Sequence, residues 1–299
     1  MDAVYINWEV ILIITMSKDT KEATKNYYDT TQISYNLVWM NKKNLAMHYG
    51  FWDKNIKNLH EALLNQNRIT ADALSIHKGD RVLDAGCGVG GSSIWIAENY
   101  GCKVTGISIV NKQIKLARKY AKNRKVDHLV NFFTKDYLKT DFENETFDKI
   151  FATESMCYAN IKADFIREMF RILKPGGSLV ISDVFLDGKI INHFDQSKLD
   201  DWMIGWAVPN IPSINVFRKD LVDNGFTISL DDNVKSRILP SAKRIYKIGR
   251  LFYPFDKFCN KIGLLSDTTF LSTVACVLQY NLFSKDIMQY HFIQVKKQE

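Results

Sequence analysis

The chain contains 299 residues, of which 46% are hydrophobic and 24% are charged. These proportions are ordinary for a soluble globular protein and exclude a fibrous or an intrinsically disordered chain. The formal net charge is +7, but Lys and Arg are spread along the sequence without a long basic block, so no nucleic-acid partner is expected. The excess charge fits either ordinary solubility or transient contact with a membrane surface that bears phosphate groups.

The beginning of the chain carries the apolar run Val10–Ile14. This run is far shorter than the roughly 20 residues needed to span a bilayer, and acidic rather than basic residues precede it, which argues against a signal peptide. Met16 follows at once, so we expect residues 1–15 to be an extension without a functional role. Residues 16–78 are expected to form a lid segment with a helix from Ile56 to Leu74.

From Arg81 onward, short apolar runs alternate with amphipathic stretches, which is the pattern of parallel strands joined by crossover helices. The predicted strands are Arg81–Ala85, Lys103–Ser108, Val130–Thr134, Phe147–Thr153, Ser178–Val184, Thr227–Asp231 and Met288–Lys296. The predicted helices between them are Ser92–Tyr100, Lys112–Asn123, Ala163–Leu173 and Phe217–Asn224.

Two later stretches, at about 187–215 and 235–285, do not follow this alternation and are rich in Trp, Tyr and Phe. We interpret them as cap insertions in a core of residues 79–299. The cap is expected over the carboxyl end of the sheet, where open α/β sheets bind ligands.

The first strand runs directly into a glycine-rich turn, in which Gly86, Gly88 and Gly90 follow Asp84 as D-x-G-x-G-x-G. Glycines at such a point allow a tight turn and close approach of a ligand to backbone N–H groups at a helix start. Nicotinamide and flavin sites use similar glycines, so the turn alone indicates only a nucleotide-type cofactor.

Other stretches of the sequence indicate the class of cofactor-binding protein more specifically than this turn does. Three stretches are similar to the ordered motifs of class I S-adenosylmethionine-dependent methyltransferases. They are Val82–Gly91, Phe147-Asp148 at the start of a central strand, and Leu173-Lys174-Pro175-Gly176-Gly177. This resemblance implies a Rossmann-like seven-stranded sheet, mostly parallel with one antiparallel strand, with helices on both faces and a helical lid. It also implies S-adenosyl-L-methionine as cofactor and S-adenosyl-L-homocysteine as product.

The stretch Gly106-Ile107-Ser108-x-x-x-x-Gln113 narrows the resemblance to the branch of sterol C-methyltransferases, tocopherol methyltransferases and cyclopropane fatty acid synthases. Most class I enzymes have an acidic residue at the ribose, whereas in this branch neutral groups replace it. By this resemblance, the cofactor would be bound by Asp84, Gly86, Cys87, Gly88, Ser108, Ile109, Gln113, Asp136, Tyr137 and Thr153. Gln113 as a solvated helix residue, and Asp136 as a turn or helix cap, are the alternatives.

The same branch begins with a Tyr-Asp pair and an H-x-G-aromatic stretch, which Tyr28-Asp29 and His48–Trp52 resemble. Its members close this segment over the cofactor, so Tyr28 and Tyr49 become candidate cofactor contacts whose rings would stabilise a sulfonium cation. Alternatively, these aromatic residues form the lid's own core. His48 is a candidate proton acceptor, although a lone histidine is more often structural.

Glu154 follows the fourth predicted strand, where enzymes of this branch place an acidic residue at the acceptor pocket. We expect Glu154 to act as a base or to stabilise positive charge, with Tyr28 and Tyr158 beside it; the alternative is a carboxylate that caps the following turn. Trp202, Trp206, Tyr246 and Phe252 are candidate walls of the acceptor pocket. Trp202 and Trp206 also have the helical spacing of residues that simply pack on the sheet.

The sequence therefore predicts an enzyme that transfers methyl to a small apolar acceptor, such as a prenyl, sterol-like or tocopherol-like metabolite, at carbon. Methylation of nitrogen or oxygen of a small metabolite is the runner-up. Cyclopropane formation, a non-catalytic cofactor-binding protein and an NAD-linked oxidoreductase are the other hypotheses. The five cysteines are odd in number and form no C-x-x-C pair, so no disulfide framework or metal site is predicted and a cytoplasmic location fits best.

Overall fold

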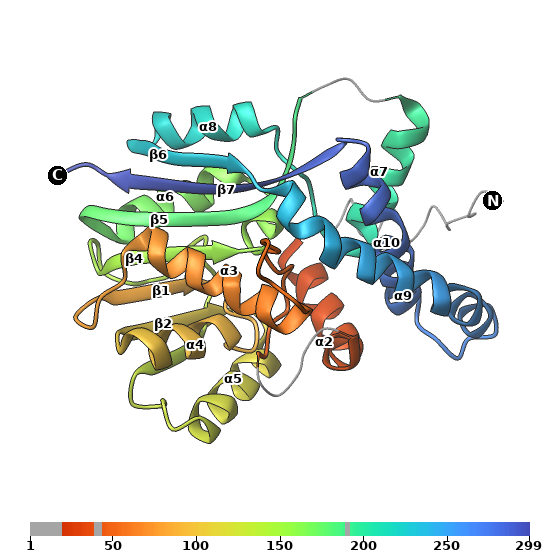
Figure 1. Cartoon of the computed structure of the whole chain (residues 1–299), viewed down its shortest axis with the longest axis horizontal. Coiled ribbons are helices and arrows are strands. Elements are labelled where there is room, and N and C mark those ends of the chain that lie inside the picture. Colours follow the sequence, from red (N-terminus) through yellow and green to blue (C-terminus); the bar gives the residue numbers. More distant parts are fainter. Residues whose placement is uncertain (1–19, 39–43, 189–191) are drawn as a thin grey trace.

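The computed structural model of the chain describes residues 20–38, 44–188 and 192–299. The expected N-terminal extension, residues 1–15, lies outside these ranges. Within them, seven strands form one sheet in the order β3-β2-β1-β4-β5-β7-β6 (Figure 1). β7 is antiparallel to β5 and β6, whereas the other strand pairs are parallel. The predicted Rossmann-like sheet with one antiparallel strand is confirmed.

The strands are short apolar segments that end in polar or glycine-containing turns. They are β1 Arg81–Ala85, β2 Lys103–Ser108, β3 Val130–Thr134, β4 Phe147–Thr153, β5 Leu173–Leu186, β6 Phe226–Asn233 and β7 Met288–Lys297. The helices are α2 Thr20–Val38, α3 Leu59–Leu74, α4 Gly91–Tyr100, α5 Asn111–Asn123, α6 Lys162–Ile172, α7 His193–Gly205, α8 Ile214–Asp223, α9 Lys235–Lys261 and α10 Asp267–Ser284, with a short 3-10 turn η1 at Met156–Tyr158.

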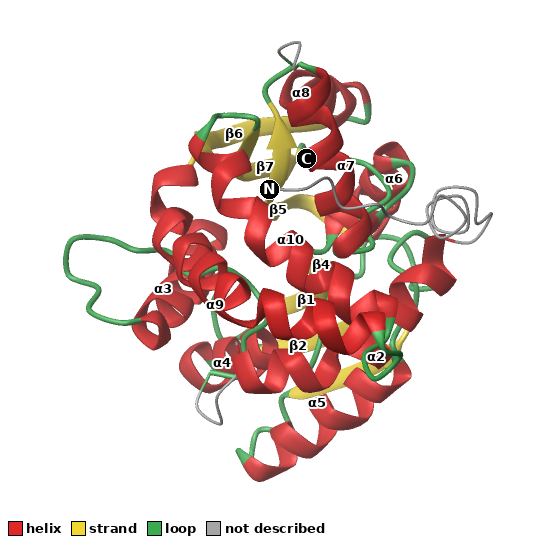
Figure 2. Cartoon of the chain, turned by 90° about the vertical axis from the view of Figure 1, so that its right-hand side faces the viewer, coloured by secondary structure: helices red, strands yellow, loops and turns green. Residues whose placement is uncertain are grey.

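The sheet separates two apolar layers, because successive side chains of a strand point to opposite faces. Val82 and Val104 face a core shared with α3, α4 and α5. Leu83 and Ile107 face a second core, to which α6 and α8 contribute Phe165 and Phe217. Figure 2 shows α3 and α4 on one side of the sheet and α6 on the other.

Four helices, α2, α7, α9 and α10, gather beyond the carboxyl ends of the parallel strands (Figure 1). α10 packs against α9, α7 and α2. Three of these helices come from the two aromatic-rich stretches that the sequence singled out, and the fourth precedes the core. Among the described helices, none is both long enough and apolar enough to cross a membrane.

Two differences from the sequence-based expectation have a clear physical reason. β5 begins at Leu173 rather than Ser178, because Leu173 pairs with Phe147 ahead of an irregularity in the ladder. α2 was not predicted, since Thr20–Val38 is rich in polar residues and lacks a clear apolar stripe. The helix buries Tyr27, whose ring lies 6.3 Å from that of Trp206.

Candidate functional site

The larger of two adjoining cavities lies at the carboxyl ends of β1, β2 and β4. The strand order reverses between β1 and β4, and this is where doubly wound sheets bind their ligands. Eleven of the twelve predicted cofactor residues line this cavity: Tyr28, Asp84, Gly86, Cys87, Gly88, Ser108, Ile109, Gln113, Asp136, Tyr137 and Thr153.

The glycine-rich turn forms the floor of this cavity. Gly86 has a φ of +120°, and a Cβ built on it would lie 2.3 Å from Cβ of Ser155, so no other residue fits there. Gly88 also has a positive φ, +51°, and its Cα faces the cavity. α4 starts at Gly91 directly behind the turn, so its N-terminal backbone N–H groups are directed towards a ligand in this space.

Asp84 is the buried carboxyl at the end of β1, only 3% exposed. The Ser93 hydroxyl donates a hydrogen bond of 2.6 Å to it from α4. Burial raises the pKa of Asp84 to about 7, and the bond from Ser93 opposes this rise in pKa. A cationic group of a ligand beside Asp84 would favour the ionised form.

Neutral polar groups line the cavity at the end of β2. The Ser108 hydroxyl donates to Oε1 of Gln113 at 3.0 Å and accepts from the backbone N–H of Val110 at 3.1 Å. Gln113 is 2% exposed, and its Nε2 lies 3.5 Å from Oε1 of Gln32 on α2. Gln113 is therefore a buried part of the cavity wall and not a solvated helix residue.

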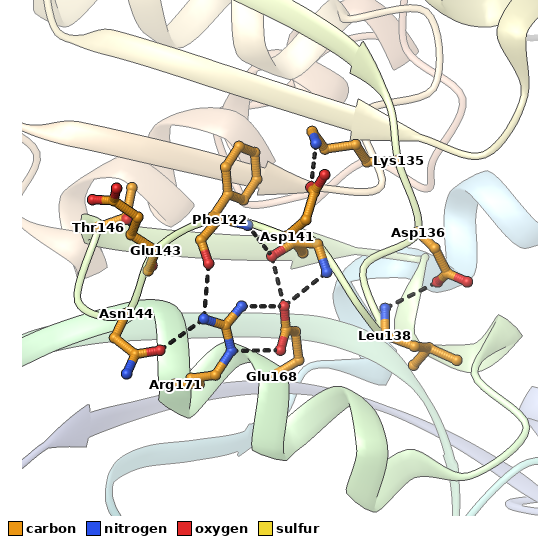
Figure 3. Close-up of polar contacts among 11 residues, drawn as sticks. Lys135, Asp136, Leu138, Asp141, Phe142, Glu143, Asn144, Thr146, Glu168 and Arg171 are labelled. Carbon is orange, nitrogen blue, oxygen red and sulfur yellow. Dashed lines mark hydrogen bonds and ion pairs between the residues drawn. The ribbon is translucent and has the colours of Figure 1, made fainter.

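The loop after β3 carries Asp136 and Tyr137. One oxygen of Asp136 accepts from the backbone N–H of Leu138 at 2.9 Å, as shown in Figure 3, and the other lies 3.0 Å from Nζ of Lys21. Asp136 thus combines the turn-capping role with a place in the cavity. The Tyr137 hydroxyl donates to the Ser155 carbonyl at 2.8 Å, so its ring stands fixed in the cavity wall.

Arg171 and Glu168 on α6 hold the far end of this loop (Figure 3). Arg171 donates to both carboxylate oxygens of Glu168, to the Phe142 carbonyl and to Asn144. Glu168 in turn accepts from the Thr140 backbone N–H and hydroxyl at 2.8 Å and 2.6 Å. The network anchors the loop, and with it Asp136, to the core.

The second cavity lies between η1, the end of β5, and α7. It shares Tyr28, Met47, Glu154 and Tyr158 with the first cavity. Trp202 and Trp206 of α7 line it, as proposed for an acceptor pocket. A ligand in one space and a ligand in the other would therefore meet beside Glu154 and the two tyrosines.

Glu154 stands at this junction in a left-handed backbone conformation, with a φ of +50°. Its Oε1 accepts from the Tyr49 backbone N–H and from the Tyr290 hydroxyl, each at 2.8 Å. Burial raises the pKa of Glu154 to about 8, and the hydrogen bonds from Tyr290 and Tyr49 limit this rise. Left-handed backbone outside glycine costs about 1–3 kcal/mol and is concentrated at functional sites.

The tyrosines beside Glu154 come from the lid and from η1. The Tyr28 hydroxyl donates to the Tyr158 hydroxyl at 2.9 Å, and their ring centroids lie 5.7 Å apart. Burial raises the pKa of both phenols, so both are neutral at physiological pH. They offer aromatic faces and hydroxyl oxygens to a cation at the junction.

His48 also lines the first cavity. Its Nδ1 lies 2.7 Å from the Tyr49 carbonyl and 3.0 Å from Oε1 of Gln66. Because both neighbours are acceptors, Nδ1 carries the proton, and burial lowers the pKa of the imidazole. His48 is thus a neutral ring held by the lid, which favours the structural alternative.

Three predicted residues do not lie where the sequence suggested. Tyr49 lines the second cavity and not the first, because its hydroxyl donates to Oε1 of Gln279 on α10. Tyr246 and Phe252 line neither cavity. Tyr246 packs on Tyr280 and accepts from Arg250, and Phe252 is 50% exposed, because α9 extends away from the sheet.

Two buried charged residues were not predicted from the sequence, and one of them, Asp183, lines the second cavity. Asp183 is 1% exposed and accepts from the backbone N–H groups of Cys157 at 3.0 Å and Val184 at 2.8 Å. The other, Lys162, lines neither cavity, and its Nζ donates to the carbonyls of Cys157, Ala159 and Asn210 at 2.6 to 3.0 Å. The signal for Asp183 was its place at the end of an apolar strand beside β4.

The arrangement defines an α/β protein with a nucleotide-type cavity at the carboxyl ends of its parallel strands and a second cavity that adjoins it. A family model described as "Methyltransferase domain" matches residues 76–227. The chain belongs to this family.

Individual relatives agree with this assignment. The chain is 31% identical over 219 residues to sterol 24-C-methyltransferase ERG6 of Saccharomyces cerevisiae, which covers 73% of this chain and 56% of the yeast protein. The chain thus spans little more than half the length of that relative.

Solved structures share the fold. Cyclopropane synthase MmaA2 from Mycobacterium tuberculosis has a TM-score of 0.78 at 16% identity and covers 92% of this chain and 98% of its own. Geranyl diphosphate C-methyltransferase from Streptomyces coelicolor A3(2) has a TM-score of 0.72 at 18% identity, with 94% and 98% covered.

Proposed function

We propose that this protein transfers the methyl group of S-adenosyl-L-methionine to a small apolar acceptor, at a carbon atom. The observation that carries the proposal is the junction of the two cavities at Glu154, Tyr28 and Tyr158. Three further findings support the proposal: the family membership, the likeness to a sterol 24-C-methyltransferase, and the fold shared with a geranyl diphosphate C-methyltransferase.

The residues of the first cavity fit the cofactor. A Cβ at Gly86 would collide with Ser155, so the turn keeps its backbone open to a ligand. Asp84 offers a carboxyl to an ammonium group, and Ser108 with Gln113 offers uncharged hydrogen bonds to a diol. The cofactor supplies a methyl group on a sulfonium centre, which is an electrophile.

The chain's own residues then position the acceptor, exclude water and move one proton. Positioning and desolvation supply much of the rate of such a displacement, and a single base suffices. Addition of methyl to an alkene leaves positive charge on the acceptor, which Glu154 and the faces of Tyr28 and Tyr158 would stabilise. We assign proton removal to the ionised form of Glu154, because its raised pKa of about 8 makes that carboxylate a stronger proton acceptor than an ordinary one.

The second cavity also indicates how the acceptor is oriented. Trp202 is 4% exposed, and its indole N–H has no hydrogen-bond partner among the described residues. A buried donor without a partner costs about 1–3 kcal/mol, so an acceptor that offers an oxygen there gains affinity. We therefore favour an oxygenated prenyl, sterol-like or tocopherol-like metabolite over a plain hydrocarbon.

A second candidate is methylation of a small amine. The buried carboxyl of Asp183, 1% exposed at the second cavity, favours it, because a carboxylate next to aromatic rings binds a protonated amine. NMR of the product formed with ¹³C-methyl cofactor separates the two, since a methyl on carbon and a methyl on nitrogen resonate in different ranges.

Binding and turnover of the wild-type chain test the proposal. Calorimetry should show binding of S-adenosylhomocysteine and no binding of NADH. A screen of prenyl diphosphates, sterols, quinols and indole-type metabolites with methyl-labelled cofactor should yield a labelled product. NADH binding without S-adenosylhomocysteine binding would overturn the assignment.

We also infer a cytoplasmic location, in line with five cysteines that are all unpaired. Contact with a membrane surface is part of the proposal, because the acceptor is apolar and the net charge is +7.

A further inference from the structure

The most exposed apolar side chains of the described residues are concentrated at one place, the end of α9 and the turn that leads to α10. Six of the twelve large apolar side chains that are strongly exposed lie between residues 251 and 264, which we call the hairpin tip. They are Leu251 (74% exposed), Phe252 (50%), Phe255 (65%), Phe258 (60%), Ile262 (51%) and Leu264 (76%).

These exposed apolar side chains lie together on the surface of the hairpin tip. Leu251, Phe255, Phe258 and Ile262 are spaced four, three and four residues apart, so they follow one face of the helix. Figure 1 shows the α9–α10 hairpin extending from the side of the molecule that carries the cap helices. A soluble protein rarely exposes a contiguous apolar surface of this kind unless it binds something there.

The charges around the hairpin tip indicate what it binds. Between residues 243 and 264 the sequence has six cations, Lys243, Arg244, Lys247, Arg250, Lys257 and Lys261, and one acid, Asp256. Asp256 accepts a hydrogen bond of 2.6 Å from Thr273 on α10, which holds the carboxylate in place but leaves its charge unchanged. The stretch from 243 to 264, which includes the hairpin tip, therefore carries a net charge of +5.

We propose that the hairpin tip docks on the surface of an anionic phospholipid bilayer. Apolar side chains on one helix face with Lys and Arg beside them are the pattern of a helix that lies in the membrane interface. Each cation near an anionic lipid surface strengthens attachment, and the long stems of Lys extend along the interface with their charge in water. A second copy of this chain is disfavoured, since its own tip would bring like charges together.

The position of the hairpin tip links membrane docking to uptake of the acceptor. This link rests on the proposed function. α10 packs against α7, and α7 carries Trp202 and Trp206 of the second cavity. An acceptor with a large apolar part partitions into membranes. Docking through α9 and α10 would hold the second cavity close to the surface from which such an acceptor leaves the lipid.

The test is cosedimentation of the full chain with vesicles. Wild type should bind vesicles of phosphatidylcholine mixed with phosphatidylglycerol, and more weakly vesicles of phosphatidylcholine alone. The double variants L251S/F255S and K257Q/K261Q should each lower the partition coefficient about tenfold or more. The matched control V216S/V222S removes two apolar side chains that are 57% and 56% exposed on α8, and should bind as wild type does.

Two further measurements make the result decisive. S-adenosylhomocysteine affinity and the unfolding midpoint of every variant should equal those of wild type, so that a loss of vesicle binding cannot come from misfolding or from a failed cofactor site. Equal vesicle binding of the tip variants and the α8 control would overturn the proposal. So would a wild-type dimer in solution that L251S/F255S dissociates, with no vesicle binding by either.

Discussion

Glu154→Gln is the most informative substitution, because it separates the charge of the residue from its shape. Glutamine keeps an oxygen that accepts from the Tyr49 backbone N–H and the Tyr290 hydroxyl, both now at 2.8 Å. It cannot ionise or accept a proton. If Glu154 is the base, turnover should fall about 10²–10⁴-fold while S-adenosylhomocysteine affinity stays within a few-fold of wild type.

The same substitution has a pH-dependent effect on stability. In the folded protein the carboxyl of Glu154 holds its proton up to about pH 8, whereas a free glutamic acid loses it near its ordinary value of 4.5. Between these values the folded state binds more protons than the unfolded state, so stability is full below pH 4.5 and is lost as the pH rises through 8. At about 1.4 kcal/mol per pKa unit the full loss is about 5 kcal/mol, and solvent screening of the partly exposed group reduces it to roughly half.

Glu154→Gln should therefore equal wild type in stability at low pH and exceed it increasingly towards pH 9. For a chain of this size about 2–3 kcal/mol corresponds to a midpoint about 5 °C higher. Thermal unfolding followed by circular dichroism at both ends of this range measures the difference. A stability difference that does not change with pH would refute the raised pKa, and undiminished turnover in Glu154→Gln would refute the role as base.

Three further substitutions test other parts of the site. Gly86→Ala should abolish binding of S-adenosylhomocysteine in calorimetry, because the added Cβ would lie 2.3 Å from Ser155. Gly79→Ala is the matched control. Its added Cβ has no atom within 4 Å, so this variant should bind S-adenosylhomocysteine normally. Lys162→Met removes the donor from three buried carbonyls and should lower the free energy of unfolding in urea by about 3–5 kcal/mol. Trp202→Phe removes an indole N–H that has no partner among the described residues, and on the proposal above the KM of an oxygenated acceptor should rise about tenfold with cofactor affinity unchanged.

The central part of the fold was predictable in detail. The bounds of β1 to β4 coincide with the predicted ones, because each strand is a short apolar run that ends at a turn. The start of β5 was not predictable, since Pro175-Gly176-Gly177 looks like a loop and only the pairing of Leu173 with Phe147 makes it strand. α2 depends in the same way on contacts with distant helices rather than on its own sequence.

The cofactor cavity was largely predictable because its residues follow directly after strand ends. The acceptor side was not. Aromatic composition cannot distinguish a side chain that lines a cavity, such as Trp202, from one that faces solvent, such as Phe252. Asp183 was missed because apolar residues lie on both sides of it near the end of β5, where a single acid looked like an ordinary strand residue.

α2 contacts both cavities from one element. Lys21 and Gln32 reach Asp136 and Gln113 at the first cavity, and Tyr28 reaches Tyr158 at the second. Neither space can be opened widely by movement of α2 without disturbing the other. We therefore expect compulsory order in steady-state kinetics, with the cofactor binding before the acceptor and the demethylated cofactor leaving last. Movement of α2 away from the cavities would then limit the rate of turnover.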